Sequence, residues 1–301
     1  MNVVRAGAAL LLAMLPSIAT AGAPFRVDVL APGVYGFRTD FYSNIFVVTS
    51  EGVIATDPIS PMVAQLYKRA IREVTPEPVR YVIYSHDHTD HIAGGGVFRD
   101  TARFVAQEHA VERIRARHNP QIVPPDITFK DEYTLSLGGK IVRLIWLGDN
   151  HSSSNIAILL PAERILMMVD MVYPGNVPFR DLPGTDLASF LATLPRIQAL
   201  DFQTLIYGHG PPGTREWVGK YIAYFDDLIA AVGKTQTVDF SIASGTSGLR
   251  VNPRIALDRY LDAVVARTVD ALRPKYGQWG GFEEWAPMNA KAVFFYLMMD
   301  S

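Results

Sequence analysis

The chain has 301 residues, 49% of them hydrophobic and 19% charged, which is typical of a globular α/β protein with one large domain or one domain and an appendage. Its formal net charge is −2 and it has no long basic run, which argues against a nucleic-acid-binding surface. Cysteine is absent, which excludes disulfides, thiol catalysis and zinc–thiolate sites, so any metal ion must be bound by nitrogen and oxygen.

Residues 1–21 have the layout of a secretory signal peptide. Arg5 supplies a positive charge, an apolar core covers 8–15, and small residues in A-x-A spacing follow at 19–23. The core is shorter than the roughly 20 residues that a membrane span requires, and no later segment is long and apolar enough. We therefore expect cleavage before Gly22 or Pro24 and favour Gly22, because a proline just after the cut hinders cleavage. The mature protein is expected to be periplasmic or secreted and to have no membrane span.

The first part of the mature chain is predicted to be rich in strands. β-Branched and aromatic runs bounded by turn residues predict strands over 25–30 and 33–39 and two strands within 43–58, joined by a hairpin turn at 50–52. Apolar residues then recur at helical spacing over 61–74. The almost wholly apolar run VRYVIYS at 79–85 is typical of a buried strand.

Strands and helices alternate through the rest of the body. Their patterns predict strands over 103–107, 139–147, 155–160, 164–170 and 203–208, and helices over 108–118 and 186–199. Two strand-rich blocks with amphipathic helices between them predict two packed sheets covered by helices, a layered α/β architecture.

Beyond residue 215 the pattern becomes helical. Apolar stripes predict three helices: one over 217–232, one that begins after the N-cap Asn252, and one over 288–299. We expect these helices either to roof a pocket or to form a homodimer contact. The expected parts are a signal peptide at 1–21, a main domain at 22–215 and a C-terminal helical extension at 216–301.

The densest polar cluster follows the strand at 79–85. Three of the seven histidines lie within the stretch HDHTDH at 86–91. Because alternate side chains of an extended segment leave the same side, His86 and His88 can bind one ion. Asp90 and His91 lie one turn further on and can serve a second ion.

Three distant residues complete the pattern. His151, Asp170 and His209 each stand where an apolar strand ends in a polar loop. A lone residue of this kind usually caps a strand, but the set indicates a metal site at one rim of a sheet. The remaining histidines, His109 and His118, lie in a charged helical segment and are not expected to take part.

These motifs resemble the metallo-β-lactamase superfamily over roughly residues 27–215, including TDP at 56–58 and GHGP at 208–211. The resemblance implies a four-layer αββα sandwich with the metal site at one edge. It also implies a ligand set: His86, His88 and His151 for the first ion, Asp90, His91 and His209 for the second, and Asp170 bridging both. Asp57 resembles the family's buried carboxylate beneath the site, although a simple strand-end cap explains it equally well.

The resemblance implies a dinuclear metal-dependent hydrolase of small molecules. Nitrogen and carboxylate ligands suit Zn²⁺, and iron or manganese would fit as well. Two such ions acidify a shared water, and the resulting hydroxide attacks an ester, thioester, lactone or related substrate. Asp90 and Asp170 are therefore the carboxylates expected to matter to catalysis. Serines 152–154 are interpreted as a loop that supports His151.

Three alternatives stay open. An exported β-lactamase would meet its antibiotic, but lactam-hydrolysing members generally carry Cys or Ser at the position of Asp170. The same residues would also serve an iron-dependent persulfide dioxygenase or a non-catalytic metal-binding protein.

Residues near the expected pocket are candidates for substrate binding. Phe41 and Tyr42 occupy a predicted hairpin tip, and Tyr173, Phe179 and Arg180 follow Asp170 in sequence. Each of the last three is also explained by packing or by a solvated charge.

Overall fold

The computed structural model describes residues 17–18, 24–182, 185–236, 245 and 252–299. The signal peptide expected at 1–21 lies outside the described residues except for β1 (Ser17–Ile18), which pairs with β2. Among the described helices, none combines the length and the apolar character that a membrane span requires.

The first sheet holds eight strands in sequence order. They are β1, β2 (Arg26–Ala31), β3 (Val34–Arg38), β4 (Ser43–Thr49), β5 (Gly52–Thr56), β6 (Val79–Ile83), β7 (Arg103–Gln107) and β8 (Ile127–Phe129). Strands β1 to β5 pair antiparallel, whereas β5 to β8 pair parallel. Helices or longer loops connect the parallel strands, so these strands all end at the same edge.

The second sheet holds six strands in the order β14-β13-β12-β11-β10-β9. They are β9 (Glu132–Leu137), β10 (Lys140–Trp146), β11 (Ile156–Leu160), β12 (Ile165–Met167), β13 (Thr204–Ile206) and β14 (Gly213–Thr214). All neighbours are antiparallel except β12 and β13. The sequence patterns missed β8 and β9, which lie at the sheet edges.

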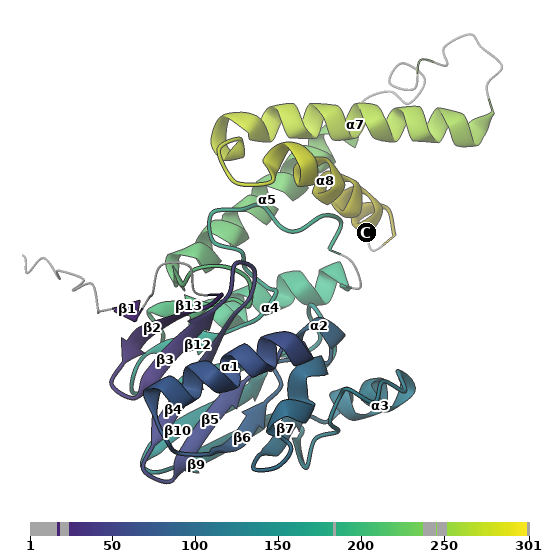
Figure 1. Cartoon of the computed structure of the whole chain (residues 1–301). Coiled ribbons are helices and arrows are strands. Elements are labelled where there is room, and N and C mark those ends of the chain that lie inside the picture. The colour runs from purple at the N-terminus through teal and green to yellow at the C-terminus, as the bar shows by residue number, and fades with distance from the viewer. Residues whose placement is uncertain (1–16, 19–23, 183–184, 237–244, 246–251, 300–301) are drawn as a thin grey trace, which may run out of the picture.

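The two sheets pack face to face, with helices on both outer faces (Figure 1). A buried aliphatic cluster with members such as Ile45, Ile54 and Ile158 fills the space between the sheets. The outer face of the first sheet packs on α1 (Pro61–Val74), the short α2 (Thr89–Ile92) and its 3-10 continuation η1 (Ala93–Phe98), and α3 (His109–Ala116). The outer face of the second packs on α4 (Leu187–Ala199) and α5 (Glu216–Gln236). The predicted four-layer αββα sandwich is confirmed.

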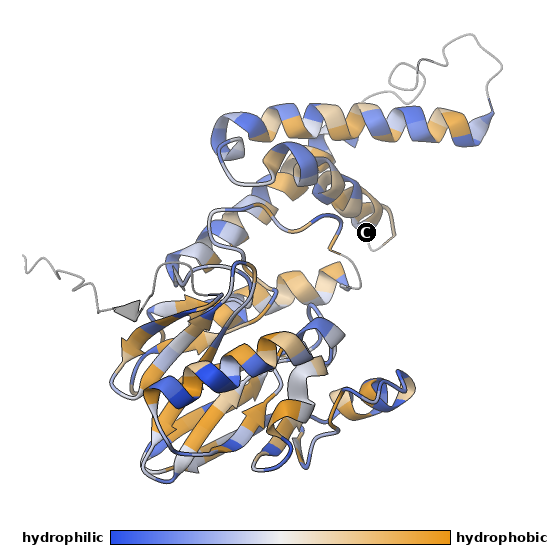
Figure 2. Ribbon diagram, in the orientation of Figure 1, coloured by the Kyte–Doolittle hydropathy of each residue, from blue (hydrophilic) through white to orange (hydrophobic). Residues whose placement is uncertain are grey.

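Helix α1 shows how local sequence fixes these layers. The Ser60 side chain accepts a hydrogen bond from the Val63 amide, and Pro61 occupies the first turn, where its missing N–H costs nothing. The helix buries its apolar face, including Tyr67 and Ile71, and turns charged residues to solvent (Figure 2).

Three helices rise from one end of the sandwich. Helix α5 runs from the second sheet toward α7 (Pro253–Tyr276) and α8 (Phe282–Met299), and all three share a hydrophobic core with α4 (Figure 1). Helix α8 begins at Phe282, six residues before the predicted start at 288.

Candidate metal centre

The seven predicted site residues follow strand ends at one edge of both sheets. His86 and His88 lie just beyond β6, and α2 then presents Asp90 and His91. From the second sheet, His151 lies between β10 and β11, Asp170 follows β12, and His209 follows β13. The Ser43 amide donates to the Gly208 carbonyl over 2.8 Å, which joins the two sheets at this edge.

The structure brings these residues into two adjacent groups. His86, His88, His151 and Asp170 form one, and Asp90, His91 and His209 form the other. Within each group, one potential ligand atom of every residue lies within 4.8 Å of the others. His88 Nδ1 and His151 Nε2, for example, are 3.1 Å apart.

Asp170 joins the two groups. Its Oδ2 lies 3.4 Å from His151 Nε2 and 3.3 Å from His91 Nε2, and its Oδ1 lies 3.0 Å from His209 Nε2. His86 Nε2 is 3.7 Å from the same carboxylate. Asp170 has φ = 61°, a left-handed backbone that is uncommon for a residue other than glycine. Such strain is common at functional sites, where the surroundings hold it.

The spacing and the unpaired nitrogens fit metal binding. Ligands about 2.0–2.1 Å from one tetrahedral ion lie about 3.3 Å from each other, close to the contacts of Asp170. His86 Nε2 and His91 Nε2 are buried and have no hydrogen-bond partner. Because buried polar atoms are normally paired, each of these nitrogens is a candidate metal ligand.

Hydrogen bonds beneath the site fix which histidine nitrogens are free. The buried Asp57 accepts from the Ser85 amide (2.7 Å), the Ser85 hydroxyl (2.6 Å) and His91 Nδ1 (3.2 Å). Since Ser85 gives its only proton to Asp57, its oxygen accepts from His86 Nδ1 at 2.9 Å. Neutral His86 is thereby held with a bare Nε2 atom toward the site, and Asp57 fixes the orientation of the His91 ring. Asp57 is thus a buried carboxylate that supports the histidines.

Other supporting residues were not predicted. Asn150 Oδ1 accepts from the His151 amide (2.6 Å) and from Asn155 Nδ2 (3.0 Å), and Asn155 Nδ2 also donates to the Val169 carbonyl. These contacts join the His151 turn to the strand end before Asp170. Both asparagines flank His151 in DNHSSSN, so the local sequence offered a signal for them.

A second support holds the HDHTDH loop from outside. The buried Asp87 accepts from the Ser154 hydroxyl (2.8 Å) and from Arg117 Nη2 (2.5 Å). Ser154 therefore supports the HDHTDH loop, in addition to lying in the turn that presents His151. No local pattern indicates the partnership with Arg117, because it comes from the end of α3.

Four of the site residues have protonation states that suit metal ligands. His91 differs, because burial alone would lower its pKa but Asp170 and Asp57 hold it well above the usual range. Burial lowers the pKa of His86 and His88, and it lowers the pKa of His151 to about 4, so these imidazoles are neutral. Burial alone would raise the pKa of Asp170, but His91 and His209 hold it well below the usual range. Neutral imidazole and ionised carboxylate are the forms that bind metal ions.

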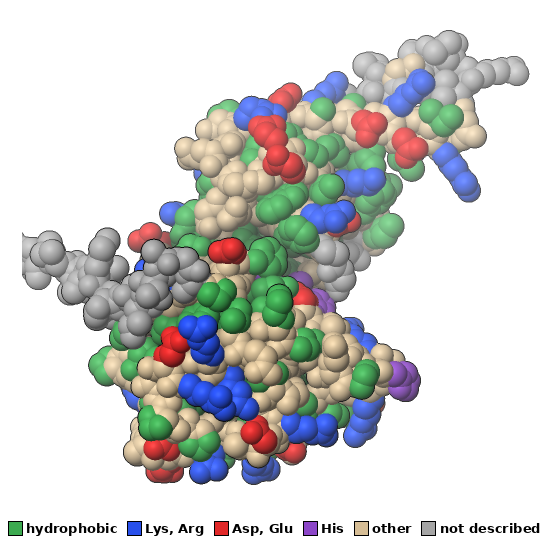
Figure 3. All heavy atoms as spheres, viewed as in Figure 1, with side chains coloured by type: hydrophobic (Ala, Val, Ile, Leu, Met, Phe, Trp, Pro, Cys, Tyr) green, Lys and Arg blue, Asp and Glu red, His purple; other side chains and the backbone are tan. Residues whose placement is uncertain are grey.

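The other residues singled out from the sequence either lie outside the two groups or line a cavity beside them. His109 and His118 lie outside both groups, and His109 Nδ1 instead contacts the Ser153 carbonyl at 3.0 Å. A cavity of about 560 Å³ opens beside the two groups and is lined by Phe41, Tyr173 and Phe179 but not by Arg180. Histidine and carboxylate atoms are visible in the recess between the sandwich and the C-terminal helices (Figure 3).

A family model described as the metallo-beta-lactamase superfamily matches residues 38–209, more than half of the chain. The chain belongs to the metallo-β-lactamase superfamily. The matched range includes all seven residues of the candidate metal centre. The candidate metal centre therefore lies wholly within the part of the chain that matches this superfamily.

Characterised members are similar over part of their length. The chain is 33% identical over 198 residues to 2,4-dinitroanisole O-demethylase subunit alpha of Nocardioides sp. (strain JS1661), a match of 64% of this chain and 58% of that protein. It is 23% identical over 189 residues to metallo-beta-lactamase type 2 of Bacteroides fragilis, a match of 59% of this chain and 75% of that protein. It is 24% identical over 146 residues to N-acyl homoserine lactonase of Bacillus cereus, a match of 44% of this chain and 57% of that protein. The match thus spans less than two thirds of the demethylase subunit and of the lactonase.

Solved structures of superfamily members share the fold. The metallo-beta-lactamase from Pontibacter korlensis superposes with a TM-score of 0.59 at 20% identity, covering 67% of this chain and 99% of that one. A metallo-beta-lactamase from Erythrobacter litoralis gives a TM-score of 0.58 at 19% identity, covering 69% and 98%. About a third of this chain therefore has no counterpart in either structure.

Proposed function

We propose that the protein is an exported dinuclear zinc hydrolase of esters, thioesters, lactones or related small substrates. Asp170 is the observation that supports two ions, because its carboxylate contacts histidines of both groups at 3.0–3.7 Å. In this proposal the first ion takes His86, His88 and His151, the second takes Asp90, His91 and His209, and Asp170 bridges them. Seven ligands are more than one tetrahedral catalytic ion uses.

Bound ions of this kind polarise a substrate carbonyl and lower the pKa of a water molecule toward neutrality. The chain's own residues supply position and protonation. Ser85 and Asp57 hold the imidazoles of His86 and His91 in their orientations, and Asp170 stays ionised between the groups. The Tyr173 hydroxyl donates to Asp170 Oδ1 over 3.2 Å, which leaves Oδ2 to face His86 and His151.

Zinc is proposed over iron and manganese because a nitrogen-rich set with open positions suits it. The discriminating experiment is elemental analysis of the mature protein, followed by chelation and re-addition of single metals. We expect about two zinc equivalents per chain, loss of turnover on chelation, and recovery with zinc. Full activity with one tightly bound iron would instead favour persulfide dioxygenase-like redox chemistry on this fold.

Substrate class is tested by a panel on the zinc-loaded enzyme. The panel includes carboxylic esters, lactones, thioesters, phosphodiesters and penicillins, together with 2,4-dinitroanisole because of the 33% identical demethylase subunit. We expect turnover of esters or lactones and weak turnover of lactams. Penicillin hydrolysis above all other activities would favour a β-lactamase, and no turnover of any compound would favour a metal-binding protein.

Export is part of the same proposal and rests on the sequence of residues 1–21. Cleavage before Gly22 would remove β1 and leave β2 as the edge of the first sheet. Mass spectrometry of the protein from the periplasm or culture medium identifies the mature N-terminus. A chain that retains Met1 in the cytoplasmic fraction would contradict export.

A further inference from the structure

Aromatic side chains from four separate segments line the cavity beside the metal centre, one of them Tyr207 just beyond β13. Phe41 comes from the β3–β4 hairpin, Tyr173 and Phe179 from the loop after Asp170, and Trp285 from α8. The Phe41 ring lies 4.6 Å from the His209 ring, and the Phe179 and Trp285 rings meet edge to face at 5.1 Å. The apolar wall therefore begins at a proposed ligand and continues to the C-terminal helices.

Two of these aromatic side chains are exposed to solvent, although they are large and apolar. Phe41 is 62% exposed and Phe179 is 41% exposed, although both lie in the cavity lining. Large apolar side chains left exposed together beside a polar centre mark a ligand-binding surface. The aromatic wall is thus available to a substrate group.

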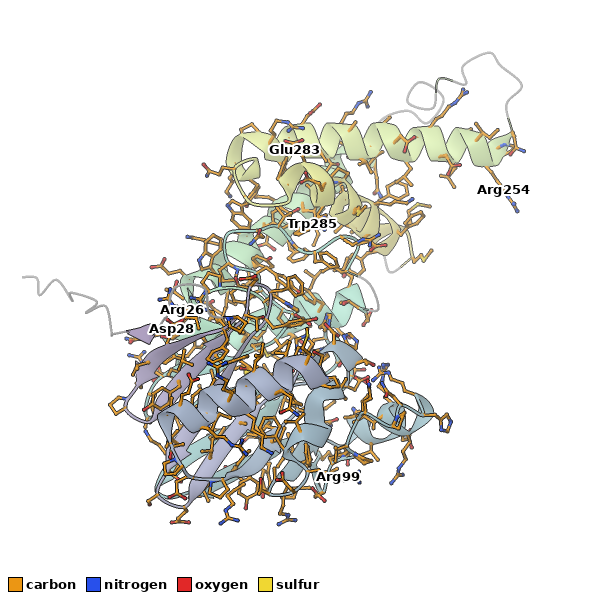
Figure 4. All side chains as sticks on the ribbon, in the orientation of Figure 1. Arg26, Asp28, Arg99, Arg254, Glu283 and Trp285 are labelled. Atoms are coloured by element: carbon orange, nitrogen blue, oxygen red, sulfur yellow. The ribbon has the colours of Figure 1, made fainter. Side chains whose placement is uncertain are left out.

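The C-terminal helices hold this wall in place. Gly280, just before α8, donates its amide to the Gly175 carbonyl (2.8 Å) and accepts from the Val177 amide (3.1 Å). The buried Asn289 donates to the Pro178 carbonyl over 3.1 Å, next to Phe179. Trp285 lies on the side of the C-terminal helices that faces the sandwich (Figure 4). The wall is therefore a preformed surface.

The charges of the cavity restrict what it can accept. Among the lining residues that the structure describes there is no lysine or arginine, whereas Asp40 lies at the rim. A carboxylate or phosphate remote from the scissile bond would meet no cationic side chain there and would lie near Asp40. The lining therefore favours uncharged substituents.

We propose that Phe41, Phe179 and Trp285 bind a flat, uncharged aromatic group of the substrate, so that the enzyme selects aryl-bearing esters or lactones. The selection of esters or lactones in this inference rests on the proposed hydrolase function. The binding of an aromatic group does not. Phe41 and Phe179 lie within residues 38–209 and Trp285 lies outside them, so the C-terminal helices add one of the three rings to the part that matches the superfamily. Planar rings gain stacking and edge contacts that a puckered ring of equal size does not.

The test uses matched compounds on the metal-loaded full mature chain. Methyl phenylacetate, methyl cyclohexylacetate and methyl 4-carboxyphenylacetate share a leaving group and differ in planarity or charge. The amides phenylacetamide and cyclohexylacetamide give dissociation constants by ligand-observed NMR, independently of ester turnover. Trp285→Ala, Trp285→Phe and Phe41→Ala are compared with Tyr296→Ala, which alters an aromatic residue of α8 outside this cavity.

The wild type should bind phenylacetamide about fivefold more tightly than cyclohexylacetamide. It should prefer the neutral phenyl ester over the other two esters by at least the same factor. Trp285→Ala and Phe41→Ala should reduce the phenyl preference to within about twofold, while Trp285→Phe and Tyr296→Ala retain most of it. Exposed Phe41 provides the test if Trp285→Ala does not fold.

Equal binding of the two amides by the wild type would overturn the inference, as would an unchanged preference in both Trp285→Ala and Phe41→Ala. Preferred binding of the phenyl amide without hydrolysis of any ester would support the aromatic site and contradict the ester-hydrolase proposal. The two proposals can therefore fail separately.

Discussion

Asp57 shows how a residue beneath the metal centre controls it. It accepts three hydrogen bonds from Ser85 and His91, and Ser85 passes the orientation on to His86. One buried carboxylate therefore orients a histidine in each group. This arrangement explains why the carboxylate lies at a strand end with no exposure to solvent.

Asp57→Asn should weaken metal binding by about 10- to 100-fold, the usual effect of losing a support behind metal ligands. The side-chain N–H of an asparagine would face the N–H and O–H groups from which Asp57 now accepts hydrogen bonds. Chelator competition measures the affinity, and circular dichroism checks that the variant is folded. Asp100→Asn, which changes a carboxylate that is 66% exposed, is the control. Unchanged zinc affinity in a folded Asp57→Asn protein would refute this role.

His88→Ala should abolish measurable turnover and lower the metal content, because His88 Nδ1 meets His151 Nε2 at 3.1 Å in the first group. A loss of at least about 100-fold in kcat/KM is expected for a missing ligand. His118→Ala, at the exposed end of α3, should change neither quantity. Near-normal kcat with full zinc content in His88→Ala would show that this residue is not a ligand.

At this scale the sequence predicted every member of the two groups but few of their supports. HDHTDH and the three strand-end residues are visible because metal ligands are rare residue types at informative places. Arg117 and Trp285 were missed because each reaches the site from a helix far away in sequence. Their residue types are common on helices, so only the tertiary fold reveals their role.

The elements that shape the pocket are the loop after β12 and helix α8. Sequence patterns placed the start of α8 at 288. The structure extends the helix back to Phe282, since Gly280 pairs with Gly175 and Val177 and anchors the first turn. Tertiary contacts thus determine where α8 begins, which the local sequence pattern did not predict. The edge strands β8 and β9 were missed for a similar reason, because only part of each is buried.

Asn289→Ala should loosen this pair of elements. The side chain donates to the Pro178 and Arg180 carbonyls and accepts from the Tyr224 hydroxyl at 2.8 Å. Leaving buried carbonyls unpaired should lower the free energy of unfolding by about 1–3 kcal/mol. Urea denaturation measures this change, with the neighbouring exposed Met288→Ala as control. Zinc content should stay at the wild-type value, so an unchanged stability or a lost ion would contradict the account.

For the whole molecule, the metal centre lies where both sheets end and where the C-terminal helices approach. One sheet supplies HDHTDH, and the other supplies His151, Asp170 and His209. Bound ions would therefore link the two halves of the sandwich, while α8 closes the pocket from outside. The sequence patterns predicted the layers of the sandwich correctly, but they left open whether the C-terminal helices roof the pocket. The presence of Trp285 in the lining shows that α8 forms part of the pocket wall.

The measurement that tests the central claim most directly is zinc stoichiometry and affinity of Asp170→Asn beside the wild type, with exposed Asp201→Asn as control. The variant keeps the shape of Asp170 but removes the charge that offsets two ions. We predict two zinc ions per wild-type chain, and at least about 10- to 100-fold weaker binding of the second ion by Asp170→Asn, with a matching loss of turnover. Two ions bound with wild-type affinity and normal turnover in Asp170→Asn would contradict a centre bridged by this carboxylate.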